Sequence, residues 1–119
     1  MLTAIGKLSE AADFANQTLQ EEDASVRPDA LRIMGTVLLR MDENKAKAAE
    51  EYILESIDLA RQNKDRYLEA YGYRALAEVY QVQRRDEDVS AAFDQAISIF
   101  EELKLDKEAK KTNVMINSS

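Results

Sequence analysis

The sequence predicts an all-α protein, a right-handed α-solenoid of about six helices arranged in antiparallel pairs. Two observations carry this prediction. The 119 residues include 3 Gly and 1 Pro, which leaves few of the turn signals that strands need, and helix-forming residues dominate. A pattern of apolar and small residues also recurs about every forty residues, as in helical repeats that bury their apolar face against a neighbouring repeat.

The clearest copy of this pattern spans two successive helices of the predicted array. Its members are Tyr73, Leu76, Ala77, Tyr80, Val89, Phe93 and Ala96. An earlier copy has the members Leu31, Met34, Gly35, Leu38, Ala49, Ile53 and Ser56. The small residues Gly35 and Ala77 are expected to have a steric role, because a bulky side chain there would push the paired helices apart.

The first two helices follow from apolar spacing and from the residues between them. Apolar residues at helical spacing predict a helix at residues 4–20, and the polar stretch 21–25 ends that stripe. Pro28 suits the first turn of a second helix, where its missing N–H has no intrahelical partner to lose. The apolar stripe of this second helix extends to Met41.

The remaining helices are separated by short polar turns. Their expected ranges are 45–62, 66–83, 87–103 and 106–116. Asp42 or Asn44 is expected to cap the third helix, since short polar side chains accept hydrogen bonds from free helical N–H groups. Asn63 is expected to take a left-handed conformation after that helix.

The segment 73–101 resembles a tetratricopeptide repeat (TPR). That motif is a helix pair with a large residue, a leucine, a small residue and an aromatic residue in the first helix, and small, aromatic and small residues in the second. The chain departs from the family where Arg61 and Glu101 replace the closing proline, and where Leu38 replaces an aromatic residue. The resemblance implies a single TPR-like helical-repeat domain over residues 1–119. Its units are a half-repeat at 4–20, repeats at 28–62 and 66–103, and a half-repeat at 106–116.

Composition excludes several classes of function. The net charge of −7 disfavours binding to nucleic acid, because phosphates repel an acidic surface. The sequence contains no run of eighteen apolar residues, so no membrane-spanning helix is predicted. His and Cys are both absent, which removes the commonest general base and the usual metal ligands. We therefore expect no enzymatic activity, no catalytic residues, no metal and no cofactor. With no secretory signal visible at the start of the sequence, a cytoplasmic location is expected.

In the family that the chain resembles, the first helices of the pairs line a concave groove in which peptides lie. Placing the motif on this sequence assigns Asp29 and one further group of residues to that groove. The group is Arg32, Thr36, Leu39, Arg40, Tyr71, Arg74, Glu78, Gln81, Lys110 and Asn113. Together with Asp29 it holds four basic and two acidic residues. We expect a protein or peptide partner there, of acidic character, with Tyr71 as a candidate anchor.

Other interpretations remain open from the sequence alone. The same charged residues would also be found on an ordinary solvated helix surface. The chain could be a self-association module that forms a homo-oligomer through exposed terminal helices. It could also be a regulatory domain cut from a larger signalling or transcription protein.

Overall fold

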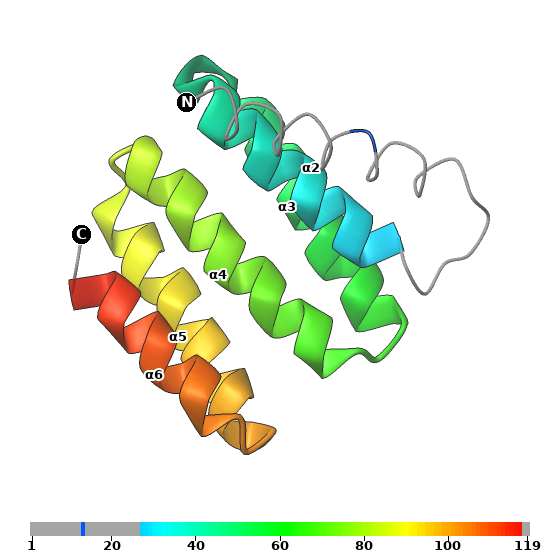
Figure 1. Ribbon diagram of the computed structural model, residues 1–119, viewed down its shortest axis with the longest axis vertical. Coiled ribbons are helices and arrows are strands. Elements are labelled where there is room, and N and C mark those ends of the chain that lie inside the picture. Colours follow the sequence, from blue (N-terminus) through cyan, green and yellow to red (C-terminus); the bar gives the residue numbers. More distant parts are fainter. Residues whose placement is uncertain (1–12, 14–26, 118–119) are drawn as a thin grey trace.

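The computed structural model describes residue 13 and residues 27–117, and within them the chain is all-α (Figure 1). The elements are α2 (Arg27–Met41), the 3₁₀ helix η1 (Glu43–Lys45), α3 (Ala46–Gln62), α4 (Arg66–Val82), α5 (Asp86–Glu102) and α6 (Asp106–Asn117). No strand occurs in this part of the chain. The helix predicted at 4–20 lies outside the described residues.

Each described helix packs against the next one in the sequence. The most extensive contacts join α2 with α3 and α4 with α5, and further contacts join α3 with α4 and α5 with α6. Helices α2, α4 and α6 run in one direction while α3 and α5 run in the other (Figure 1). Helix α2 also contacts α4, although the two helices are not neighbours in the sequence.

Small residues allow the close packing within and between the pairs. A Cβ added to Gly35 would lie 2.7 Å from Cγ1 of Ile53 and 3.0 Å from the backbone oxygen of Ala49. This confirms the steric role expected for Gly35. A Cβ added to Gly72 would lie 2.5 Å from Cγ1 of Ile57, so a second glycine sets the approach of α4 to α3.

The three turns after α3, α4 and α5 share one geometry. Each contains a residue with positive φ: Lys64 at 57°, Arg84 at 58° and Lys104 at 61°. The N–H of the next residue donates back into the preceding helix, as Asp65 does to the oxygen of Ala60 at 2.8 Å. This is the hydrogen bond of a Schellman motif, which satisfies a carbonyl at the helix end. The left-handed residues stand twenty positions apart, at 64, 84 and 104.

The prediction for Asn63 is wrong, because its φ is −81° and Lys64 takes the left-handed conformation instead. Helix α3 ends at Gln62, as predicted, and Asn63 follows as its C-cap residue with right-handed backbone geometry. The Schellman bond from Asp65 then requires the left-handed residue at position 64.

The connection between α2 and α3 is built differently. The side chain of Asp42 accepts a hydrogen bond from the N–H of Asn44 at 3.0 Å and caps η1. Helix α3 follows η1 without a side-chain cap of its own. Asp42 is therefore a cap, as one of the two predicted alternatives, but it caps the 3₁₀ turn rather than the third helix.

Candidate functional site

An open groove with a volume of about 860 Å³ lies along α2, α4 and α6. Its apolar lining comes from Leu39 of α2, Val82 of α4, and Val114 and Met115 of α6. Its polar lining comes from Arg40, Glu43, Glu78, Gln81 and Arg84. The groove therefore joins an apolar strip to a rim that carries both signs of charge.

Four of the sequence-predicted residues line this groove: Leu39, Arg40, Glu78 and Gln81. Leu39 is also part of the core, since its side chain is 6% exposed. Arg40 and Glu78 face each other across the groove from α2 and α4, with 3.8 Å between Nη2 and Oε2. The sequence pattern grouped these residues because α2 and α4 occupy equivalent places in the two pairs.

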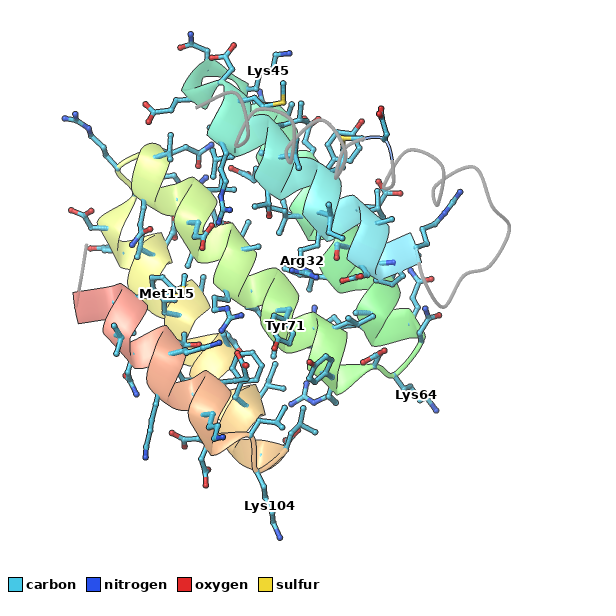
Figure 2. The ribbon with its side chains drawn as sticks, in the orientation of Figure 1. Arg32, Lys45, Lys64, Tyr71, Lys104 and Met115 are labelled. Carbon is cyan, nitrogen blue, oxygen red and sulfur yellow. The ribbon has the colours of Figure 1, made fainter. Side chains whose placement is uncertain are left out.

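Three more predicted residues, Tyr71 and two arginines that lie over its ring, form an adjoining cluster; Figure 2 labels Tyr71 of α4 and Arg32 of α2. The guanidinium carbon of Arg74 lies 4.7 Å from the ring centroid, and that of Arg32 lies 5.4 Å from it. The ring also packs edge-on against Phe100, with 5.2 Å between centroids. Burial raises the pKa of Tyr71 to about 12. The ring thus joins α2, α4 and α5 through contacts within the chain.

The last three predicted residues lie outside the nine that line the groove. Thr36 is half-buried on α2, and Asn113 is exposed on α6. Lys110 lines a second open hollow of about 440 Å³ together with Lys107, Lys111 and Val114, and Val114 also lines the groove.

The sequence register on α6 differs by one residue from the register in the structure. Because the left-handed residues of the turns are spaced by twenty, α4 and α6 are related by a shift of forty. That shift takes Arg74 to Val114, which lines the groove. The predicted groove residue Asn113 lies thirty-nine positions after Arg74, one residue short of that shift.

Three arginines of the groove and the adjoining cluster, Arg32, Arg40 and Arg74, are paired with carboxylates. Arg32 forms an ion pair with Asp29 in α2. Arg74 donates a hydrogen bond to Oε2 of Glu108 in α6 at 2.9 Å. Since Arg40 is paired with Glu78, each of these arginines has an acidic neighbour. The sequence count of four basic and two acidic residues omitted Glu108, so the balance of charge is closer to neutral than expected.

Two of these carboxyl groups have pKa values shifted in opposite directions. Burial raises the pKa of Glu78, because desolvation disfavours the carboxylate more than Arg40 and the other nearby arginines favour it. The hydrogen bond from Arg74 lowers the pKa of Glu108. The fold therefore disfavours the ionised form of Glu78 and favours the ionised form of Glu108.

Sequence reasoning missed five residues that line the groove: Glu43, Val82, Arg84, Val114 and Met115. Arg84 lies between the predicted helix ranges 66–83 and 87–103, in one of the short polar turns, and it is exposed in the structure. The twenty-residue spacing of the turns was the signal that could have found Val114. Nothing in the local sequence marks Glu43 or Val82, because their position depends on how the two pairs pack together.

The described residues contain no cluster of three or more acidic residues arranged to hold a metal ion. Among the helices of residues 27–117, none combines the length and the apolar character that a membrane span requires. The chain was also compared with known proteins: no family model, no curated protein and no solved structure matches it. The resemblance to TPR proteins therefore stays a prediction.

Proposed function

We propose that this chain is a TPR-like solenoid that works as a protein-interaction module, with a peptide or partner helix held in the groove between α2, α4 and α6. The groove itself carries the proposal. Its volume of about 860 Å³ is in the range of ligand sites, and it is long enough to be lined from three helices. A cytoplasmic location and the absence of enzymatic activity stay predictions.

The lining favours an amphipathic segment as the ligand. Leu39, Val82 and Met115 offer an apolar strip to one side of such a segment. Arg40 and Arg84 are exposed and Glu78 is half-buried, so charges of both signs are available to its polar side. Packed helices present these groups in fixed positions, which reduces the ordering entropy that binding must overcome.

A peptide selection tests this proposal. A random peptide library is panned against the full chain, and a selected peptide is labelled for fluorescence anisotropy. The double variant Arg40→Glu with Arg84→Glu changes two exposed groups of the rim. We expect its Kd for the peptide to change by about tenfold or more, since charge pairs at an interface set specificity.

The matched control is Lys47→Glu with Lys64→Glu. Both lysines are exposed and neither lines the groove. Lys64 has the same left-handed turn conformation as Arg84, so the two variants change net charge and turn chemistry equally. The proposal is wrong if no peptide is selected, or if the control variant changes the Kd as much as the groove variant does.

A further inference from the structure

Helix α6 presents a basic surface that no other described helix covers. Lys107, Lys110, Lys111 and Val114 line a hollow of about 440 Å³ on this surface. The lining is almost entirely apolar, because the aliphatic stems of the lysines and the side chain of Val114 form it while the ammonium groups reach solvent. Val114 is 63% exposed. This basic surface suits an apolar side chain that is surrounded by carboxylates.

Helix α3 carries a surface of that description. Leu54 is 39% exposed and is the one exposed large hydrophobic residue of this helix. Glu51, Glu55 and Asp58 are exposed at helical spacing around it. The acidic surface of α3 thus matches the basic surface of α6 in both charge and spacing, with an apolar group in each.

Most charged groups on the two surfaces have no ion-pair partner within the described residues. Within residues 27–117, Arg32, Arg40, Arg74 and Arg85 pair with carboxylates on their own or neighbouring helices. By contrast, Lys107 and Lys110 on α6, and Glu51, Glu55 and Asp58 on α3, form no ion pair with any residue in that range. Lys111 is the exception, at 4.0 Å from Glu108.

The two surfaces cannot meet within one molecule. Helix α3 packs between α2 and α4, whereas α6 packs on α5 at the other end of the row of helices (Figure 1). We propose that a second copy of this chain docks its acidic α3 surface onto the basic α6 surface of the first, with Leu54 of one copy in the hollow beside Val114 of the other. Such a contact is head-to-tail and leaves one free surface at each end, so it can continue along a chain of copies.

The expected association is weak, because a contact between two helix faces is small compared with a stable interface, and we anticipate a Kd of about 10–100 µM. Sedimentation velocity of the full chain over a concentration series at low salt should show a rising weight-average mass. High salt should reduce association by about tenfold or more, since exposed charges are screened. A chain that remains monomeric at the highest concentration in low salt would overturn the proposal.

Charge reversal tests which surfaces pair. Lys107→Glu with Lys110→Glu and, separately, Glu51→Lys with Glu55→Lys should each reduce association by about tenfold or more. A mixture of these two variants restores opposite charges across the contact and should regain association. Failure of the mixture to associate, when each variant alone is folded by circular dichroism, would show that the two surfaces do not pair.

Two further variants keep the test specific. Asp94→Lys with Glu101→Lys makes the same change of net charge on α5, where both residues are exposed, and should leave salt-dependent association within about twofold of the wild type. Leu54→Ser keeps every charge and should weaken association several-fold by removing the apolar group from the contact. If the α5 variant abolishes association as well, net charge and not the α3 surface governs it and the proposal is wrong. Groove variants do not alter either surface, so this proposal can fail while the groove proposal stands.

Discussion

The two helix pairs, α2–α3 and α4–α5, occupy equivalent places in the sequence pattern. They differ in the residues at their packing positions and in the connection between their helices. At equivalent positions the first pair has Gly35 with Ile53, and the second has Ala77 with Phe93. Ile53 and Phe93 are both fully buried, at 0% exposure. The first pair is joined through η1 and the second through a Schellman turn. The comparison teaches that two helix pairs with the same sequence pattern can bury equivalent positions although their connecting turns differ.

The largest expected effect comes from emptying the buried positions that the two pairs share. Phe93→Ala should lower the free energy of unfolding by about 3–5 kcal/mol, and Ile53→Ala by about 2–5 kcal/mol, because each leaves a cavity in a core cluster. Urea unfolding followed by circular dichroism measures both. If either substitution costs less than about 1 kcal/mol, that position is not a packing centre of its pair and the equivalence of the pairs is wrong.

The next effect separates the small residues of the pairs. Gly35→Ala should destabilise the chain by about 1–2 kcal/mol, because the added methyl group meets Ile53 and the backbone of Ala49 at short distances. In an Ile53→Ala background the same substitution should cost less, since the clash with Ile53 is gone while the contact with the backbone oxygen of Ala49 at 3.0 Å remains.

A double-mutant cycle on urea unfolding measures this coupling. The matched control is Ala77→Gly in the second pair, which should cost about 1 kcal/mol with no dependence on Ile53. Additive effects of Gly35→Ala and Ile53→Ala would show that the close approach in the first pair does not limit its packing.

A smaller effect distinguishes the two connections. Arg84→Gly should raise stability by about 0.5 kcal/mol, because glycine adopts the left-handed conformation without the steric penalty of a side chain, although it also gains freedom in the unfolded chain. Asn44→Gly in the first connection should give no such gain, since no residue of that connection has positive φ. Thermal unfolding of both variants provides the comparison. A gain at position 44 equal to that at 84 would argue against the difference in turn geometry.

The smallest effect concerns the contact between the pairs, and it depends on pH. The pKa of Glu78 is raised in the folded chain, so its ionised form destabilises the fold at neutral pH, and this penalty disappears as pH falls through the folded pKa. The pKa of Glu108 is lowered, so its contribution is stabilising above the unfolded pKa near 4.5 and is lost as pH falls through the lower folded value.

Relative to the wild type, Glu78→Gln should therefore be more stable at neutral pH, and Glu108→Gln less stable. Both differences should shrink in acid. Unfolding midpoints measured at neutral pH and at about pH 4 test these signs. A Glu78→Gln variant that is less stable than the wild type at neutral pH would show that the ion pair with Arg40 outweighs the desolvation of Glu78.

The helix ranges could be predicted because helix formation follows from the local spacing of apolar residues. For α4 and α5 the predicted ranges 66–83 and 87–103 differ by one residue at their ends from Arg66–Val82 and Asp86–Glu102. The left-handed residue was placed at Asn63 instead of Lys64, since its position follows from the hydrogen bond that closes the helix and not from the residue type.

The groove was only partly predictable. Leu39, Arg40, Glu78 and Gln81 could be found from the repeat register, because α2 and α4 are equivalent helices. The residues that α6 adds to the groove could not be identified in the same way. Their identification requires the number of positions that relates α4 to α6, and the sequence pattern of this last helix is too incomplete to fix that number. The pairing of Arg74 with Glu108 likewise depends on how α6 approaches α4, which no local pattern encodes.

The central claim is that the groove between α2, α4 and α6 holds a partner segment. Its most direct test is a two-dimensional ¹H–¹⁵N NMR titration of the labelled chain with a selected peptide. We predict that the amide signals that shift most belong to residues lining the groove, among them Leu39, Gln81, Val82 and Met115, while those on the exposed faces of α3 and α5 stay in place. Shifts confined to α3, α5 or the basic surface of α6, with the groove signals unchanged, would contradict the account.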